Sequence, residues 1–472
     1  MGDEKKSVAI VGAGIFGLSL AVALCERGHT VTVFDRNQYD DNGYSPDEDG
    51  VQAASVDHNK ILRASYGSKL HYQRLAMESR QAWLDTDKAS EDGRLLFDPC
   101  GMLRVQPSSE LSALERETLA NMERDGLRDT QFVKSKPDDR KRAQEQGWEA
   151  KLLEFAIPDR ADGATFEAVL DSLAGFVKCS KACAHFHQLS QSKGVQFVFG
   201  PEEGAFDSLV LDDRKRAKGL RTKDGQVHPA DVVVVAAGSY STQVLPELGY
   251  HLESSAGSLA TFKIDKKDKT MWKKYSPERF PVITWKSTPR DPAGKDTGSV
   301  YVLPRTDEGL VKIGYRGIKF TNFQPTPREA PFSQDGKWSV PLPPAESVCL
   351  PQSADEAIRQ FVDVFLPDFK GLPYHSTRLC WYTDSLDNSF VVDYVPTFAD
   401  RSVFVCTGGS GHGAKFLPVL GQHAADILEN GDASSSFMRP HWRWRPDAKR
   451  SNGLEEGPDG PREISKHDRM CK

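Results

Sequence analysis

The stretch Ser7–Gly17, SVAIVGAGIFG, decides the fold of this chain. Its β-branched start predicts a short buried parallel strand, and the apolar residues of Leu18–Arg27 recur at helical spacing. Thr30–Phe34 predicts a second strand, which leads to Asp35. Together these segments form a strand–helix–strand unit with a glycine-rich turn after its first strand, which is the context in which a dinucleotide binds.

Three glycines of this stretch have the spacing G-x-G-x-x-G that is typical of dinucleotide-binding turns. Gly12 allows a tight turn, Gly14 lets the backbone approach a pyrophosphate, and Gly17 lets the helix pack closely on the strand. Ile15 and Phe16 belong to the first helical turn, whose free N–H groups attract negative charge. We therefore assign all five residues to a cofactor-binding site.

A carboxylate follows the second strand at Asp35, with Arg36 beside it. A carboxylate about 20 residues beyond the glycines can bind ribose hydroxyls and would repel a 2′-phosphate, which disfavours NADP. The motif alone does not distinguish NAD from FAD. The later strand Asp231–Ala237, which ends in Gly238, favours FAD because two-dinucleotide-binding flavoproteins have a similar strand and turn. Val195, at the start of another predicted strand, is also assigned to the cofactor site.

Length and charge predict a chain of two domains whose partners are small molecules. The 472 residues exceed one ordinary core, and the net charge of −6 argues against nucleic acid as a partner. No apolar run reaches membrane-spanning length, and no apolar signal core precedes the first strand. We expect a cytoplasmic monomer, with an oligomer as the open alternative. The final Met470-Cys471-Lys472 does not match the peroxisomal signal SKL.

The eight cysteines predict free thiols and no metal site. None of them forms a C-x-x-C pair, and Cys179 and Cys183, although suitably spaced for one helix face, have no histidine partners. An intracellular protein keeps such thiols reduced.

Strands that end in glycine-rich turns recur far apart in the sequence, at Gly12, Gly238 and Thr407. In a doubly wound sheet the carboxyl ends of parallel strands line one crevice, where ligands bind. The alternating segments of Ser258–Gly317 predict an antiparallel sheet above that crevice. The predicted fold class is α/β, with a Rossmann-like FAD-binding domain and a second, mainly antiparallel-sheet substrate domain interleaved in the sequence.

The predicted domain boundaries follow from this interleaving. The FAD-binding domain takes residues 1–90, 165–245 and 375–440, the substrate domain takes 91–164 and 246–374, and 441–472 form an irregular tail. Locally, Phe176–Ser192 predicts a helix, whereas Asp40–Gly50 and Phe320–Pro344 predict loops. The charged residues from about 108 to 151 predict surface helices.

The segment Arg378-Leu-Cys380-Trp-Tyr382-Thr-Asp384 points to the chemistry most directly. It resembles a block of the sarcosine oxidase, pipecolate/saccharopine oxidase and fructosyl amino acid oxidase family, which are FAD-dependent amine oxidases of the D-amino-acid-oxidase-like superfamily. The resemblance covers nearly the whole chain and is weakest in residues 108–160 and in the tail. It implies that Cys380 carries FAD as an 8α-S-cysteinyl thioether and that Tyr382 lies at the active site. A buried free cysteine is the alternative for Cys380.

The glycine-rich turn within Val405–Phe416 resembles the family's SGHGFK-type turn, with Ala414 where an aromatic residue is common. The resemblance implies that Gly411 and Gly413 direct N–H groups and a helix dipole at the flavin, which stabilises the reduced anion. Lys415 matches a family lysine that binds a substrate carboxylate, and we also assign it to the cofactor site. A solvated helix lysine is the alternative.

The segment Gly309–Arg316, GLVKIGYR, resembles the family segment in which a lysine beside flavin N5 activates oxygen. Lys312 matches that lysine, because a nearby cation stabilises the superoxide that the first electron makes. An exposed strand lysine is the alternative. Arg316 stands where the family often has histidine, and its guanidinium could pair with a second acid group or close the pocket.

The segment Ala54–Gly67 resembles the family's loop-to-helix segment that packs on the flavin. Arg63 matches the arginine with which sarcosine oxidases bind the substrate carboxylate bidentately. Lys60 replaces an arginine and is expected to touch the flavin or its phosphates, with Ser55 at the same cofactor site. Asp57 either lies near the amine or caps a helix.

The four blocks predict an FAD-dependent oxidase of secondary amines that bear a carboxylate, such as an N-methyl amino acid, pipecolate or saccharopine. Arg63 and Lys415 hold the carboxylate, hydride transfer to flavin N5 gives an imine, and O2 is reduced to hydrogen peroxide. The imine is hydrolysed or trapped within the substrate. Three alternatives stay open: a fructosyl amino acid oxidase, against which Arg63 argues, a flavin dehydrogenase with a protein electron acceptor, and a flavin-binding scaffold without turnover.

Overall fold

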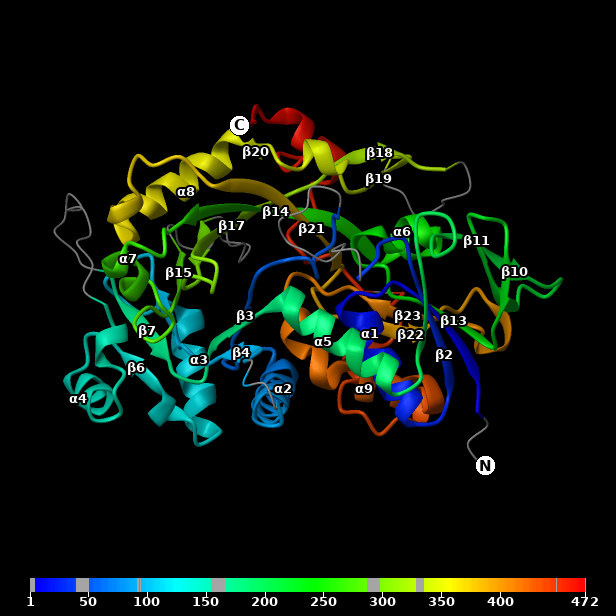
Figure 1. Ribbon diagram of the computed structural model, residues 1–472, viewed down its shortest axis with the longest axis horizontal. Helices are drawn as coiled ribbons and strands as arrows, with labels where there is room; N and C mark the ends of the chain where they lie inside the picture. The colour runs from blue at the N-terminus through cyan, green and yellow to red at the C-terminus, as the bar shows by residue number, and fades with distance from the viewer. Residues whose placement is uncertain are drawn as a thin grey trace.

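The structure is a computed structural model that describes residues 5–39, 51–90, 93, 95–153, 166–286, 298–327, 335–446 and 448–471. Two large sheets organise these residues, one mainly parallel and one mainly antiparallel (Figure 1). Segments from distant parts of the sequence contribute to each sheet, so the two halves are interleaved along the chain. This arrangement confirms the predicted fold class. The predicted loop Asp40–Gly50 lies outside the described residues.

The parallel sheet has six strands in the order β22-β23-β13-β1-β2-β9. All neighbours run parallel except β22, which pairs antiparallel with β23 at one edge. The strands are β1 (Ser7–Val11), β2 (Thr30–Asp35), β9 (Gln196–Phe199), β13 (Val232–Val235), β22 (Val391–Tyr394) and β23 (Val403–Thr407).

Two layers cover this sheet. Alternate side chains of β1 point to opposite faces, so Val8 and Ile10 join one buried cluster whereas Ala9 and Val11 join another. The first cluster includes side chains of three helices, and the second includes side chains of a small antiparallel sheet. The helices are α1 (Ile15–Glu26), α2 (Leu70–Lys88) and α9 (Leu417–Asn430), with α5 (Cys179–Ser192) packed on α1; the small sheet has β10 (Phe206–Leu211), β11 (Ala217–Thr222) and β12 (Val227–Pro229).

The turn after β1 requires two of its glycines. Gly12 has φ +113°, and a Cβ there would lie 2.5 Å from the carbonyl oxygen of Ala236. A Cβ at Gly17 would lie 1.9 Å from the carbonyl oxygen of Gly12, so only glycine lets α1 pack this closely on the turn. The start of α1 is thereby held at the carboxyl ends of β1 and β13.

The second sheet has eight strands in the order β21-β14-β17-β16-β15-β5-β7-β6, and all pairs are antiparallel except β15 with β5. The strands are β5 (Met102–Val105), β6 (Gln131–Val133), β7 (Ala168–Asp171), β14 (Leu252–Lys263), β15 (Val282–Lys286), β16 (Ser299–Val302), β17 (Leu310–Phe320) and β21 (Ser376–Ser385). Helix α8 (Gln352–Phe365) lies over this sheet at the top of Figure 1, and its Phe361 shares a buried cluster with Ile313 of β17. The exact domain boundaries stay a prediction, although β7 and β21, from residues assigned to the FAD-binding domain, pair in this sheet.

Shorter elements surround the two sheets. The charged stretch 108–151 contains α3 (Ala113–Arg124) and α4 (Pro137–Glu145), with β6 between them. Ser112 caps α3 by accepting a hydrogen bond from the Glu115 N–H. Two further short helices are α6 (Ser241–Val244) and α7 (Lys269–Lys274). Within the described ranges, no helix combines the length and apolar character needed to cross a bilayer.

Two local predictions need correction. The helix predicted from Phe176 begins only at Cys179, because Gly175–Val177 forms β8, which lies between β3 (Lys60–Leu62) and β4 (Phe97–Asp98). The segment predicted as a loop from Phe320 to Pro344 contains two short strands that pair antiparallel, β18 (Phe323–Pro325) and β19 (Lys337–Ser339). A strand of three residues is too short to show the alternation of apolar and polar residues in its sequence. Whether it forms depends on the strands with which it pairs.

The C-terminal tail is more ordered than predicted. It contains α10 (Arg439–Trp442) and β24 (Arg469–Met470), which pairs with β20 (Leu350–Pro351). Cys349 and Cys471 form a disulfide, which corrects the expectation that every thiol is free. The two cysteines are separated by 122 positions, and only the fold brings their Cα atoms within bonding reach.

Candidate functional site

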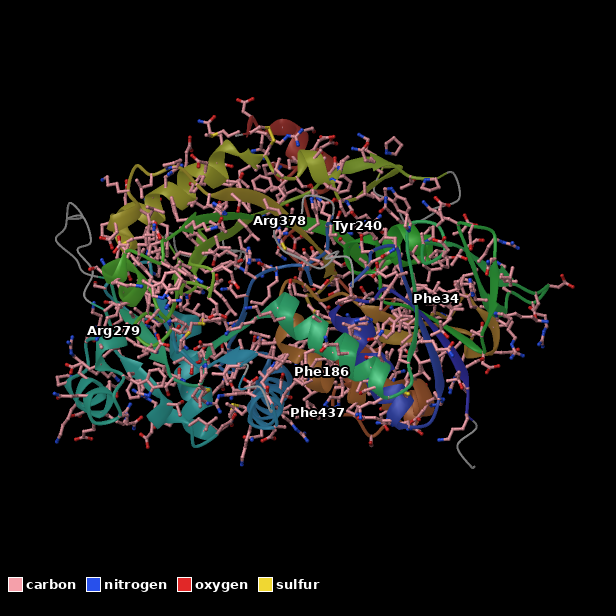
Figure 2. All side chains as sticks on the ribbon, viewed as in Figure 1. Phe34, Phe186, Tyr240, Arg279, Arg378 and Phe437 are labelled. Atoms are coloured by element: carbon pink, nitrogen blue, oxygen red, sulfur yellow. A yellow bond between two sulfur atoms is a disulfide. The ribbon has the colours of Figure 1, made fainter. Side chains whose placement is uncertain are left out.

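A cavity of about 1430 Å³ is lined by residues of both large sheets. It includes the carboxyl ends of β1, β2 and β13, and it continues to residues of β14, β17 and β21. Phe34 and Tyr240, both labelled in Figure 2, line it on the side of the parallel sheet. The cavity therefore lies where a doubly wound sheet places its ligands.

Asp35 and Arg36 are held by local contacts at the end of β2. The Asp35 Oδ2 atom accepts a hydrogen bond from the Ala13 N–H at 2.8 Å, and the Arg36 guanidinium lies 4.0 Å from the centre of the Tyr240 ring. A Cβ at Gly238 would meet no atom within 4 Å, so this strand end leaves open space. Asp35, Arg36 and Gly238 line the cavity at the strand ends.

Most residues that the sequence predicted for the site line this cavity. They are Gly12, Gly14, Ile15, Phe16, Asp35, Arg36, Ser55, Lys60, Arg63, Gly238, Arg316, Cys380, Tyr382, Gly411, Gly413 and Lys415. Gly17 packs beneath the turn, and Lys312 is buried behind the wall. Val195 does not reach the cavity, because it precedes β9 at the amino end of the strand and is buried in the core. Its assignment to the cofactor site stays a prediction that this position does not support.

Arg63 and Lys415 meet at one aromatic ring. The charged group of each lies 4.8 Å from the centre of the Tyr66 ring. The Lys415 carbonyl accepts hydrogen bonds from Ser79 Oγ and Trp83 Nε1 of α2, which fixes the base of its side chain. In the described part of the chain neither cation forms an ion pair with a carboxylate. The pair can therefore take a carboxylate from a ligand.

The protonation state of Lys415 depends on whether an anion binds beside Lys415 and Arg63. Burial lowers the pKa of Lys415 well below its ordinary value, and repulsion from Arg63 adds to the shift. Burial also raises the pKa of Tyr66 to about 12, so its phenol stays neutral. An incoming carboxylate would offset the repulsion and favour the protonated lysine, so ligand binding and protonation are coupled.

Asp57 is the centre of a buried ionic cluster. Its Oδ1 atom lies 2.9 Å from Lys312 Nζ, and its Oδ2 atom lies 2.7 Å from Lys60 Nζ. Arg378 Nη2 lies 4.0 Å from Oδ1, and Lys312 also donates to the Asn59 carbonyl. Asp57 is 0% exposed and Lys312 is 1% exposed. Lys312 is thus not an exposed strand lysine, and Asp57 lies in a turn before β3 rather than at the start of a helix.

The cluster shifts the pKa of each member. Burial alone would raise the pKa of the Asp57 carboxyl, but Lys312, Lys60 and Arg378 together hold it well below its usual range. Burial lowers the pKa of Lys312 despite the attraction of Asp57, and Lys60 adds to that shift. For Lys60, the nearby anionic groups outweigh burial and raise the pKa well above its ordinary value. Lys312 is therefore the cation of this cluster that loses its proton more easily.

Cys380 lies on β21, opposite Gly257 of β14, and lines the cavity. Its thiol is outside any disulfide and is 8% exposed. Lys60 Nζ lies 3.5 Å from its Sγ atom, close enough to orient the sulfur. The thiol is therefore placed to react with a group bound in the cavity.

Arg316 lies between an aromatic ring and the glycine-rich turn. Its guanidinium carbon is 4.9 Å from the centre of the Tyr382 ring, and its Nη1 atom donates to the Gly411 carbonyl at 3.2 Å. A Cβ at Gly411 would lie 2.4 Å from the same guanidinium, so the glycine provides the space that Arg316 fills. The structure thus brings three predicted residues into contact.

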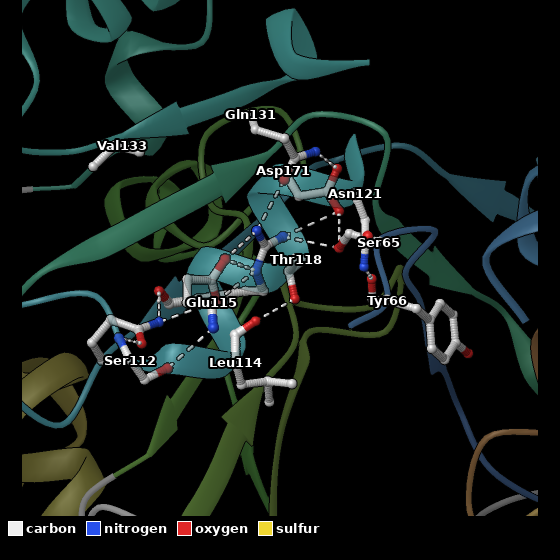
Figure 3. A network of polar contacts seen from close by, with 12 residues as sticks. Ser65, Tyr66, Ser112, Leu114, Glu115, Thr118, Asn121, Gln131, Val133 and Asp171 are labelled. Atoms are coloured by element: carbon white, nitrogen blue, oxygen red, sulfur yellow. Dashed lines mark hydrogen bonds and ion pairs between the residues drawn. The ribbon is translucent and has the colours of Figure 1, made fainter. Parts of the chain in front are cut away.

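A second buried network was missed by sequence reasoning. Arg104 of β5 donates to Glu115 at 2.6 Å and 3.0 Å, to Gln131 at 2.9 Å, to Ser65 at 3.1 Å and to Asp171 at 3.2 Å (Figure 3). Arg104 and Glu115 of this network also line the cavity. The one sign in the sequence was an arginine within a short apolar run, which a strand places on an inward face.

Comparison with known proteins agrees with this geometry. The model of the family described as FAD dependent oxidoreductase matches residues 7–427. The chain belongs to this family. The resemblance predicted from the four sequence blocks is thereby confirmed at the level of the family, and FAD is its cofactor.

Curated relatives and solved structures cover almost the full chain. The L-saccharopine oxidase of Schizosaccharomyces pombe (strain 972) is 28% identical over 463 residues, which cover 95% of each protein. The monomeric sarcosine oxidase of Bacillus sp. (strain NS-129) is 23% identical, with 90% of this chain and 93% of that protein covered. A modified fructosyl peptide oxidase from Aspergillus nidulans, in complex with FSA, has a TM-score of 0.77 at 24% identity over 99% of each chain. This last likeness concerns the fold.

The residues present fit FAD. The turn of Gly12 and Gly14 opens onto the cavity with the start of α1 behind it, as a pyrophosphate requires. Asp35 stands at the end of β2 for a ribose, and the glycine-rich turn with Gly411 and Gly413 lines the far wall. The length of the cavity, from the strand ends to the antiparallel sheet, suits an extended dinucleotide.

Proposed function

We propose that this protein is an FAD-dependent oxidase of secondary amines that bear a carboxylate, with O2 as acceptor and H2O2 as product. The observation that carries the proposal is the pair Arg63 and Lys415, two cations at one Tyr66 ring with no carboxylate partner among the described residues. A bidentate guanidinium and a second cation suit a substrate carboxylate. Relatives named saccharopine oxidase and sarcosine oxidase support the same substrate class.

The protein's own groups would prepare the amine for oxidation. Arg63 and Lys415 fix the carboxylate, which orients the neighbouring C–H and C–N bonds in the cavity. Tyr382 and Arg316 pack on each other in the wall of the same cavity. FAD, when bound, would accept the hydrogen and the two electrons of the C–H bond next to the nitrogen, so that the C–N single bond becomes the C=N bond of an imine. The cations around Asp57 stabilise the negative charge that develops when O2 is reduced.

The test of this function is a panel of amines with peroxide detection. Sarcosine, an N-methyl amino acid, pipecolate and saccharopine are each mixed with the holoprotein in air, beside a fructosyl amino acid. We expect equimolar H2O2 with one or more of the carboxylate-bearing amines, and a higher kcat/KM than with the fructosyl compound. Absence of flavin bleaching with every amine would contradict the proposal. Bleaching followed by slow reaction with O2 would instead indicate a dehydrogenase that needs another electron acceptor.

Covalent attachment of FAD through Cys380 is part of the proposal. We expect the yellow colour to remain with wild-type protein after acid precipitation and to appear in the supernatant for Cys380→Ala, because the substitution removes the only proposed bonding atom. Absorbance of pellet and supernatant measures this directly. Cys25→Ala, in α1 and away from the cavity, is the matched control and should retain the bound colour. A flavin that stays bound in Cys380→Ala would contradict the assignment.

A further inference from the structure

The cavity wall is far more basic than the chain as a whole. Of the described residues that line it, twelve are lysine or arginine and four are aspartate or glutamate, whereas the full sequence has a net charge of −6. A wall of this sign favours ligands with several negative charges. The diphosphate of FAD uses part of this charge. The basic groups open to a substrate are those whose donors the protein leaves unsatisfied.

Arg104 is not such a group. All three of its guanidinium nitrogens donate to protein acceptors, and two of its partners are the carboxylates of Glu115 and Asp171 (Figure 3). Its charge is therefore already neutralised inside the protein. A ligand anion would have to displace a buried carboxylate to bind there, which is unfavourable.

The basic residues on the tail side of the cavity are also paired. Lys319 Nζ lies 2.8 Å from Asp384 Oδ1 and donates to the Asn452 carbonyl at 2.9 Å. Arg462 Nε lies 3.4 Å from Glu456 Oε2. These pairs leave little capacity for a new anion, although they keep the region polar.

Arg316 differs from these residues because it has no ion pair with a carboxylate among the described residues, whereas Arg462, whose Nε also lacks a hydrogen bond, is paired with Glu456. Arg316 donates to a neutral acceptor, the Gly411 carbonyl, and rests on the Tyr382 ring. Its Nε atom is buried and has no hydrogen-bond partner among the described residues. Asp384 is the nearby acid, and its Oδ1 is taken by Lys319 while Ser255 donates to its Oδ2. An unsatisfied buried guanidinium donor is costly, and a ligand carboxylate would remove that cost.

Arg316 and Lys415, one of the two residues proposed to bind the first carboxylate, lie at the same glycine-rich turn. Arg316 touches Gly411, and Lys415 follows four residues later with its side chain at the Tyr66 ring. Arg316 comes from β17, whereas Arg63 follows β3, so the two guanidinium groups reach the cavity from different elements. A ligand in the cavity can therefore contact both cationic places at once.

We propose that Arg316 binds a second acid group of the substrate, so that the preferred substrates are secondary amines with a carboxylate on each side of the nitrogen. The inference rests on the proposed function, since it assumes that Arg63 and Lys415 hold the first carboxylate. The nitrogen and its oxidisable C–H bond then lie between two anchored ends. Two anchors restrict the rotation of a flexible chain and reduce the entropy lost at the reactive step.

The test compares matched substrates. N-(2-carboxyethyl)glycine has a carboxylate on both arms of its nitrogen, N-(2-carbamoylethyl)glycine replaces one by an amide, and sarcosine has a single carboxylate. We expect the wild-type holoenzyme to prefer the first over its amide by roughly 10- to 100-fold in kcat/KM, the usual strength of a charged hydrogen bond. In Arg316→Gln, kcat/KM for N-(2-carboxyethyl)glycine should fall to about that of its amide through a higher KM, whereas sarcosine, which has no second carboxylate, should lose much less. Arg316→Lys, which keeps the charge, should retain part of the preference.

Arg214→Gln is the matched control, because Arg214 is a surface arginine paired with Asp400. It should keep the wild-type preference. Wild-type turnover of sarcosine without any gain from a second carboxylate would overturn the inference and leave the proposed function standing. Equal losses on all substrates in Arg316→Gln, with the flavin spectrum intact, would also overturn it. Turnover of no amine by the wild type would reject the proposed function itself.

Discussion

Replacement of Asp57 by asparagine is expected to lower the free energy of unfolding by about 3–5 kcal/mol, the typical cost of breaking a buried ion pair from one side. Asp57 is fully buried, and its two oxygens contact Lys312 and Lys60. Asparagine keeps the shape of the side chain but removes its charge. The buried ammonium group of Lys312 and the partly buried one of Lys60 are then left without their counter-ion. Chemical denaturation of the two holoproteins side by side measures the difference.

An exposed aspartate with two lysine partners serves as the control that separates the effect of burial on the free energy of unfolding from the effect of charge alone. Asp307 also contacts two lysines, Lys178 and Lys181, each at 3.2 Å, but its side chain is 62% exposed. Asp307→Asn should therefore cost at most about 1 kcal/mol, as exposed ion pairs do. If both variants were equally mild, the cluster around Asp57 would not contribute to stability in the way argued.

The pH dependence of this contribution has a defined sign. The pKa of Asp57 in the folded protein lies well below its ordinary value, so the folded state favours the carboxylate. The stabilisation is present above the unfolded pKa of about 4 and is lost as the pH falls below it. Asp57→Asn should consequently show a weaker loss of stability in acid than the wild type.

The parallel sheet could be predicted because its information is local. Ser7–Gly17 specifies a strand, a turn and a helix within a few residues, and the structure has β1 and α1 at these positions. Other features depend on partners far along the chain. The strand β8 replaces the start of a predicted helix, and Cys471 bonds to a cysteine 122 positions away. Neither leaves a periodic pattern in the sequence.

The positions of the candidate residues could be predicted wherever a motif fixes a side chain, although their roles stay predictions. Arg63, Lys415 and Cys380 line the cavity as expected. Val195 stays a prediction, but it begins its strand and does not line the cavity, whereas ligands bind at the carboxyl ends of parallel strands. The central place of Asp57 could not be predicted, because Lys60 is only three residues away but the second lysine partner, Lys312, lies 255 positions along the chain and the alternation of a strand does not reveal what its residues face.

Replacement of Lys312 by methionine is expected to slow the reaction of the reduced protein with O2 by about 10²- to 10³-fold, the usual effect of removing one electrostatic contact to a developing negative charge. Lys312 does not line the cavity, but its charge acts through a buried, weakly screened region. Anaerobic reduction by the amine should change much less. Stopped-flow mixing of pre-reduced protein with O2 measures the two half-reactions separately.

The pH profile of the O2 reaction is the test of whether Lys312 is the responsible cation. Burial lowers its pKa, so the rate should fall as the pH rises through that lowered pKa, and Lys312→Met should lack this fall. Lys60 has a raised pKa and stays charged, so Lys60→Met should keep the pH-dependent fall whatever its effect on the rate. Removal of Asp57 takes away an attraction that supports the charged lysine, so Asp57→Asn should move the fall to lower pH. An unchanged O2 rate in Lys312→Met would assign this role to another group.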